Sequence, residues 1–307
     1  MTDIKCIFCK QPSHTSKSVE HIIPESLGSK QKVLPKGVVC DSCNQYFALK
    51  VEKPILSHES FRNVRAYYQV PSKKGKMPSV LGSIAGTDIK VGLKLNKDNS
   101  INLQPENEKD REQFEKLYNK DVVDFPPLMF PISYDPPKKE MARLLAKMAL
   151  EALVYEYKSV KEWVDVVVES SHYDLIREFA RFDRTFREWP FHQRRVFPDE
   201  TQMVHPDTGE WVQVGFGHDV MVTPNRETYF VFLYYGIEYV INIGGPSIKG
   251  YEKWLDENNN ISPMVERHGL KLVTRETQGK IMYFLEGEKV TSVFFNEVHK
   301  YMGKKEQ

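Results

Sequence analysis

The sequence lacks any long hydrophobic run, which excludes a membrane-spanning helix. No apolar stretch approaches the roughly 20 residues that such a helix needs. The first residues contain no apolar segment of the kind that directs secretion, so we expect a cytoplasmic protein. Internal repeats and low-complexity segments are also missing. Hydrophobic residues nevertheless make up 40% of the 307 residues, enough for one large domain or two ordinary ones with a sizeable core.

Cysteine is scarce and confined to one part of the chain. All four cysteines lie within the first 43 residues, and the rest of the sequence has none. A disulfide framework is typical of short secreted chains, which this sequence does not resemble. The spacing Cys6-x2-Cys9 and Cys40-x2-Cys43 instead indicates two turns that complete a tetrahedral site, so we predict a structural Zn2+. Two redox dithiols are the alternative, but they lack a thioredoxin-like βαβ context.

Net charge is also small, at +1, but its distribution is uneven. Residues 1–80 contain 13 Lys and Arg against 6 Asp and Glu, whereas the remaining residues contain 30 against 36. Four zinc-bound thiolates would lower the N-terminal balance to about +5. This asymmetry favours a polyanionic partner, although chance clustering of solvated charges is the alternative. The candidates for contacts with nucleic-acid phosphates are Lys30, Lys32, Lys36, Arg62 and Arg65.

The sequence pattern predicts an α+β protein with three parts. Residues 1–56 form a compact N-terminal unit, residues 57–125 a basic connector with a β-hairpin and a helix, and residues 126–307 an α+β C-terminal domain. In the first unit, a helix is expected to begin near Cys40 and to stop at Pro54. The helices expected elsewhere are 106–120, 138–157 and 173–182, and the strands are 87–103 as a hairpin, 212–216, 228–234, 237–243, 281–285 and 290–294.

A second set of residues lies between and beside the cysteine pairs. Ser18-Val-Glu-His-Ile-Ile-Pro-Glu-Ser-Leu-Gly28 precedes the second pair, and Asn44 follows Cys43 directly on the predicted helix. An acidic residue with His, then Ile-Ile-Pro and a Gly turn, then Cys-x2-Cys-Asn, resembles the zinc-bearing HNH (ββα-metal) endonucleases. The resemblance covers roughly residues 4–56. An isolated Glu-His pair is usually an ordinary surface pair, and it is the order of several elements that makes the likeness specific.

The resemblance implies a metal-dependent endonuclease that hydrolyses the phosphodiester bonds of DNA. Glu20 and Asn44 offer hard oxygen ligands, which suit Mg2+ or Mn2+. His21 would act as the general base, because its ordinary pKa lies near neutrality. Adjacent residues of a regular strand point to opposite faces, so a bend or ligation from the side is required for Glu20 and His21 to serve one phosphate. Glu52 lies about 12 Å from Asn44 along a regular helix, too far to share a ligand sphere.

One departure from the family pattern leaves the activity open. The middle Asn of the HNH motif, which braces the loop between the strands, has no counterpart in residues 29–39. The rival hypotheses are a zinc module that binds nucleic acid without cutting it, and a nuclease that is silent until a partner protein binds. Residues beyond about 125 carry no motif with recognisable chemistry, so we expect them to serve recognition or regulation through a protein or ligand trigger. A role as a restriction or anti-phage effector fits this scheme.

Overall fold

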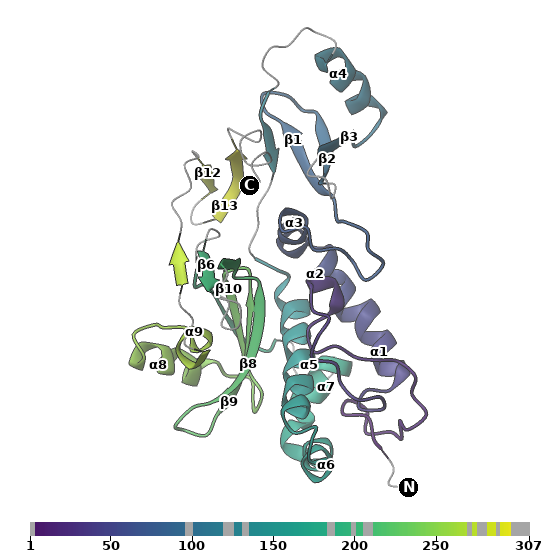
Figure 1. Ribbon diagram of the computed structural model, residues 1–307, viewed down its shortest axis with the longest axis vertical. Coiled ribbons are helices and arrows are strands. Elements are labelled where there is room, and N and C mark those ends of the chain that lie inside the picture. The colour runs from purple at the N-terminus through teal and green to yellow at the C-terminus, as the bar shows by residue number, and fades with distance from the viewer. Residues whose placement is uncertain are drawn as a thin grey trace. The chain divides into compact units, whose positions relative to one another are not determined.

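The computed structural model of the chain confirms the predicted α+β class (Figure 1). The residues that it describes are 4–95, 101–118, 126–130, 135–182, 188–197, 201–204, 211–268, 272–274, 281–286 and 289–295. By its internal contacts the chain divides into two compact units. The first combines residues 1–55 with 137–276, and the second combines 56–136 with 277–307. The predicted division at 56 and 125 stays a prediction about parts that fold on their own.

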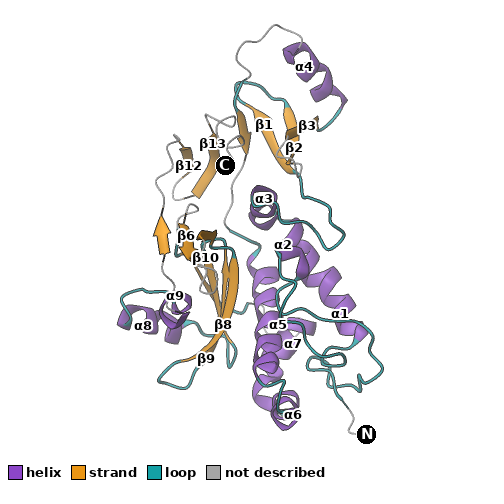
Figure 2. Cartoon of the chain, viewed as in Figure 1, coloured by secondary structure: helices purple, strands orange, loops and turns teal. Residues whose placement is uncertain are grey.

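The first unit places two antiparallel sheets beside a group of helices (Figure 2). Its helical segments are η1 (Glu25–Leu27), α1 (Asp41–Phe47), η2 (Ala48–Glu52), α5 (Lys138–Glu156), α6 (Lys161–Glu169), η3 (Ser171–Tyr173), α7 (Asp174–Phe182), α8 (Lys249–Glu257) and α9 (Pro263–His268). The larger sheet has the order β5 (Phe191–Arg195), β10 (Ile237–Asn242), β9 (Thr228–Tyr234) and β8 (Phe216–Val222). The smaller has the order β11 (Leu272–Thr274), β6 (Thr201–Val204) and β7 (Trp211–Gln213).

A tight turn joins β9 to β10 at Tyr235 and Gly236. Both residues have positive φ, 43° and 82°, which matches the right-handed twist of the two strands. A Cβ on Gly236 would stand 2.5 Å from the carbonyl oxygen of Phe197, so this position requires glycine. The turn sets the register in which Ile237 pairs with Tyr234, and both predicted strands are confirmed.

Helix α5 is the central element of the first unit. The prediction of a helix over 138–157 is confirmed, and the helix is buried on all sides over most of its length. Every residue from Met141 to Val154 is buried, including Lys147 and Glu151. Neighbours on several sides cause this, because α5 packs against α6, α7 and η2 and also against strands β8, β9 and β10. A helix that is surrounded in this way has no solvated face for its charged residues.

The helix that begins after Cys40 does not stop at Pro54, contrary to the prediction. It runs through α1 and the π-helical turn η2 into α2 (Lys53–Ser57). The amide of Lys53 donates to the carbonyl of Ala48, five residues earlier, as in a widened turn. Pro54 then occupies the first turn of α2, where a missing N–H and a fixed φ are tolerated.

The second unit is built on one antiparallel sheet. Its strand order is β12 (Ile281–Glu286), β13 (Lys289–Phe295), β4 (Leu128–Phe130), β1 (Val80–Ile84), β2 (Lys90–Leu95) and β3 (Ile101–Pro105). The predicted hairpin at 87–103 and the helix near 106–120, now α4 (Glu108–Tyr118), are confirmed. A further helix, α3 (Glu59–Tyr67), lies within the segment that the sequence marked as basic. Ile84, Ile89 and Val91 form the core of this unit.

None of the described helices combines the length and the apolar character that crossing a membrane requires.

Candidate active site and zinc knuckle

The four cysteines converge at the N-terminal end of α1. Their sulfur atoms all lie within 4.8 Å of one another, and those of Cys9 and Cys40 are 3.7 Å apart. Four ligands at a Zn–S distance of about 2.3 Å would stand about 3.8 Å from each other at the corners of a tetrahedron. The turn that carries Cys6 is closed by a hydrogen bond from the amide of Lys10 to the carbonyl of Cys6. The cluster therefore fits the predicted zinc site.

The pKa values of the cysteines differ widely, because their sulfur atoms lie so close together. A hydrogen bond from Cys43 lowers the pKa of Cys6 to about 5, whereas burial raises the pKa of Cys9 to about 11. Four thiolates this close repel each other unless a dication neutralises them. The guanidinium of Arg181 on α7 adds a hydrogen bond of 3.2 Å from its Nε to Cys43 Sγ and lies over the ring of Tyr46. Helix α7 thus contacts the zinc knuckle, the name used below for the four cysteines and the turns that carry them.

A short two-stranded ribbon carries Glu20 and His21. The amide of Leu34 donates to the carbonyl of Glu20 at 2.9 Å, and His21 pairs with Val33 as an antiparallel bridge. Along this ribbon Glu20 and Ile22 are buried, whereas His21 between them is half-buried. The alternation places Glu20 on the inner side and His21 on the outer side, as expected of neighbours on a strand. The chain bends at Ile22, directly after the pair.

Glu20 is 8% exposed and its carboxylate meets a lysine from α5. Lys147 Nζ lies 2.6 Å from Glu20 Oε1, 3.1 Å from Glu52 Oε1 and 3.0 Å from Glu151 Oε2. Burial by itself favours the neutral amine, but the three carboxylates outweigh it and hold the pKa of Lys147 well above its usual value. Burial raises the pKa of Glu151 well above its usual value. Sequence reasoning missed Lys147 and Glu151, and it set Glu52 aside by its distance from Asn44, without considering this link to Glu20.

Asn44 stands beside the strand that carries the pair. Its Nδ2 lies 3.5 Å from the carbonyl oxygen of Val19, the residue before Glu20. In this orientation Oδ1 is left to accept a cation, because the amide nitrogen faces the backbone. The ring of His21 has no hydrogen-bond partner among the described residues, so its nitrogens remain available to water. The backbone segments that carry Glu20, His21 and Asn44 therefore lie close together in space. The carboxylate of Glu20, however, is shared with Lys147.

Asp41, at the first position of α1, anchors the segment that leads into this ribbon. Its carboxylate accepts hydrogen bonds from the amides of Lys17 and Ser18 and from the hydroxyl of Ser18. The hydrogen bonds from Ser18 and then that from Lys17 lower the pKa of Asp41 below its usual value. In the loop that lacks the family's middle Asn, the buried Ser29 donates to the carbonyl of Gln31 at 3.2 Å. Local groups thus stabilise both sides of the ribbon.

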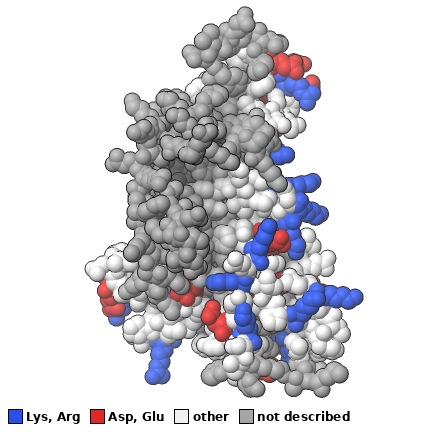
Figure 3. Space-filling model, in the orientation of Figure 1, with Lys and Arg blue, Asp and Glu red and all other residues white. Residues whose placement is uncertain are grey.

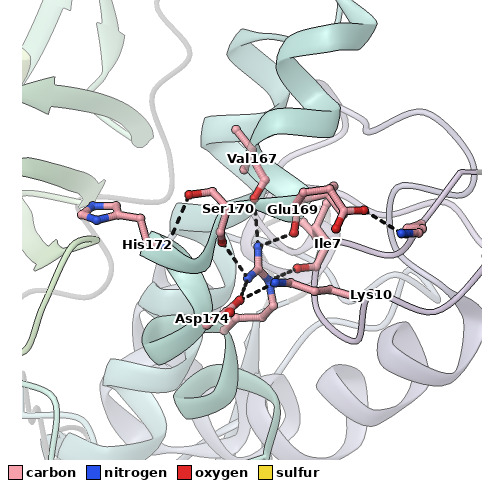
Figure 4. A network of polar contacts seen from close by, with 10 residues as sticks. Ile7, Lys10, Val167, Glu169, Ser170, His172 and Asp174 are labelled. Carbon is pink, nitrogen blue, oxygen red and sulfur yellow. Dashed lines mark hydrogen bonds and ion pairs between the residues drawn. The ribbon is translucent and has the colours of Figure 1, made fainter.

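Arg177 on α7 connects the knuckle to the C-terminal end of α6. Its side chain is buried, with Nε donating to the carbonyl oxygen of Ile7 and Nη2 donating to those of Val167 and Val168 at 2.9 and 3.1 Å. It also pairs with Asp174. One guanidinium therefore satisfies carbonyls from two segments that lie far apart in the sequence, and Figure 4 labels Ile7 and Val167 from these segments.

Two lysines of the knuckle extend this network (Figure 4). Lys10 lies 2.6 Å from Asp174, and Lys5 lies 2.7 Å from Glu169 at the end of α6. Both pairs are largely solvated, so each contributes little to stability by itself. With Arg177, however, they direct the knuckle onto α6 and α7 in one orientation.

The predicted phosphate-binding residues are not equally available. Lys30, Lys32 and Lys36 are exposed on the ribbon loop. Arg62 is partly buried on α3, and Arg65 is buried, with Nη1 3.4 Å from the carbonyl oxygen of Leu56. Figure 3 shows Lys and Arg side chains spread over the face that includes α1 and its neighbouring loops, with acidic side chains between some of them. The three lysines are therefore better placed than the two arginines to meet a phosphate.

Comparison with known families agrees with this site. Residues 6–60 match the family of HNH endonucleases. Residues 6–60 thus form an HNH endonuclease domain, which contains the four-cysteine cluster and the ribbon. A domain of this family indicates a nuclease with a nucleic-acid substrate. No curated protein and no solved structure is significantly similar to the chain.

Proposed function

We propose that this protein is a metal-dependent HNH endonuclease that hydrolyses phosphodiester bonds of DNA, with a structural zinc in its cysteine knuckle. The observation that carries the proposal is the ribbon geometry within the matched domain. The ribbon holds Glu20 on its inner side and leaves His21 on its outer side with no partner among the described residues. In the cell, a role as a restriction or anti-phage effector remains part of this hypothesis.

The donor set of the site suits Mg2+ or Mn2+. Glu20 retains a second carboxylate oxygen beside the one held by Lys147, and Asn44 retains Oδ1. Both are hard oxygen donors of the kind that these cations prefer. Such a cation would neutralise charge on the scissile phosphate and stabilise the leaving oxygen.

His21 supplies the proton transfer in this scheme. An unprotonated ring nitrogen accepts a proton from water as the water attacks phosphorus. The bridge between His21 and Val33 fixes the backbone that carries the ring, on the outer side of the ribbon. Lys30, Lys32 and Lys36 would hold neighbouring phosphates without reading sequence.

A plasmid-nicking assay tests this function directly. We expect cleavage that depends on added Mg2+ or Mn2+ and stops with a chelator. His21→Ala should lower the cleavage rate by about 10²–10⁴-fold, the usual contribution of a general base, with DNA affinity nearly unchanged. His14→Ala is the matched control, because His14 is an exposed histidine of the same knuckle and should cut at the normal rate.

Two other results would select the rival functions. DNA binding without cleavage under any of these metals would indicate a non-cleaving zinc module. Cleavage that appears only when a second protein is added would indicate a nuclease subunit that is silent by itself. A His21→Ala variant that cuts at the normal rate would show that another group is the base.

A further inference from the structure

A fully buried lysine lies behind the cleavage site and joins it to α5. Lys147 has no solvent exposure, and its ammonium group has a carboxylate oxygen within 3.1 Å in three directions. The three acids come from three different segments: Glu20 from the ribbon, Glu52 from η2 and Glu151 from α5 itself. An ammonium has three N–H donors, so each carboxylate can accept one.

This arrangement exceeds what charge neutralisation alone needs. One carboxylate would suffice to compensate a buried lysine, and Glu52, 3.1 Å away, can provide it without Glu20. The shortest of the three contacts goes instead to Glu20, which is 127 residues away in the sequence. The ammonium also fills the point between the acids, so they do not form a second cation site.

The contact with Lys147 fixes one carboxylate oxygen of Glu20 and leaves the second oxygen available to a metal ion. Oε1 is held at 2.6 Å by a side chain that cannot move into solvent, and Glu20 itself is 8% exposed. A carboxylate that is held in this way offers its second oxygen in one direction. Outer contacts of this type commonly orient metal ligands, and their loss weakens metal binding.

We propose that Lys147 is a positioning residue of the cleavage site, which orients Glu20 toward the catalytic metal ion by holding its other carboxylate oxygen. This inference rests on the proposed function, in which Glu20 is a metal ligand. It assigns part of the active-site architecture to helix α5, which lies beyond the end of the matched HNH domain.

Mn2+ binding to the full-length protein, followed by electron paramagnetic resonance of the free ion, is the test. Lys147→Met alone would leave three buried acids without their cation, so the comparison uses an E52Q/E151Q background. In that background K147M should weaken Mn2+ affinity about 10–100-fold, the range typical of lost outer contacts. Zinc content should stay close to that of E52Q/E151Q, whereas the melting temperature should fall, because Glu20 alone remains buried without its cation. Mn2+ affinity is therefore compared at a temperature where both proteins are folded.

Lys147→Arg provides a second variant that keeps the positive charge. A guanidinium is planar and larger than an ammonium, so it cannot reproduce the same three contacts. We expect kcat to fall while KM for DNA stays nearly constant, with the fold retained. A purely structural lysine would predict normal kcat in any K147R protein that folds.

Each remaining outcome has a definite meaning. Unchanged Mn2+ affinity in both Lys147 variants would overturn the positioning role while leaving Glu20 as a ligand. Tighter Mn2+ binding would show that Lys147 competes with the metal, which also overturns the proposal. Glu20→Gln in the otherwise natural chain tests the proposed function separately. Normal Mn2+ affinity of this variant would refute the assignment of Glu20 as a metal ligand.

Discussion

The four cysteines make two contributions at the level of single residues. They bring the N-terminal turn to the start of α1, and Cys40 also caps that helix, because its sulfur accepts a hydrogen bond from the amide of Cys43 at 3.4 Å. Ile7 and Phe8 of this turn are buried, but a segment this small rarely folds unaided, so a metal would be a major source of its stability. In zinc-finger peptides, structural zinc supplies about 10–16 kcal/mol of apparent binding energy.

The purified protein should therefore contain one tightly bound Zn2+ per chain. We expect Cys40→Ser to lose this ion and to lower the melting temperature sharply, because the zinc loses a ligand while serine can still cap the helix. Elemental analysis and thermal unfolding measure the two effects. Ser42→Ala, at an exposed neighbouring position on α1, should change neither. Folded, soluble protein without zinc would contradict the assignment.

The residues that the sequence could identify share one property, which is local spacing. The two Cys-x2-Cys turns, the Glu20-His21 pair and Asn44 are recognisable because each depends on neighbours a few residues away. Lys147 was not recognisable in this way. Its role depends on the packing of α5 against the ribbon and η2, and no periodicity in the sequence encodes that packing.

At the level of elements, the ribbon loop has a distinct task in the proposed function. Lys30, Lys32 and Lys36 are exposed on it, directly before or beside the residues that pair with the strand of Glu20 and His21. A loop tied to the strand of the general base can place phosphates at a fixed distance from it. The affinity for DNA should then depend on the charge of these lysines, whereas kcat should depend on the residues of the ribbon.

Replacing these three lysines with alanine should weaken DNA binding and leave kcat at saturating DNA unchanged. The log–log dependence of affinity on salt should become shallower by about 0.9 for each lysine that contacts a phosphate. Binding measured across a salt series checks this. The double variant K249A/K253A, at exposed lysines of α8, should keep the original slope. An equal change of slope in both variants would show that the ribbon loop has no special role in binding phosphates.

The elements themselves were predicted well where periodicity was strong. Helix α5 begins at the predicted residue and ends within one residue of the predicted end, because its apolar spacing is regular. The continuation of the first helix past Pro54 was missed, since a proline usually ends a helix and only the widened turn at η2 accommodates it here. How fully a helix is buried depends on its neighbours, and the sequence of α5 does not specify them.

At the level of the whole molecule, chain order and spatial order differ. The sequence suggested contiguous parts, with boundaries near 56 and 125. In the structure, residues 1–55 and 137–276 form one compact unit. The HNH domain contributes carbonyl and carboxylate groups to this unit, and the later helices contribute the cations that meet them, above all Lys147 and Arg177. Such an arrangement makes the later helices part of the nuclease scaffold as well as candidates for regulation.

This interdependence predicts the behaviour of a fragment that ends at residue 136. Without α5 and α7, Glu20 loses its buried cation, the carbonyl of Ile7 loses the guanidinium of Arg177, and the apolar side of η2 is exposed to water. Unsatisfied polar groups and exposed apolar surface both favour unfolding. We expect fragment 1–136 to lack a cooperative melting transition in residues 1–55 and to hold zinc weakly. Fragment 1–276, which retains the whole first unit, is the control, and its first unit should melt as in the full chain. Calorimetry with zinc analysis compares the two fragments.

If fragment 1–136 keeps its zinc and melts cooperatively at the same temperature, the zinc knuckle folds without the later helices. The C-terminal part would then act as a separate recognition or regulatory domain, as the sequence alone suggests.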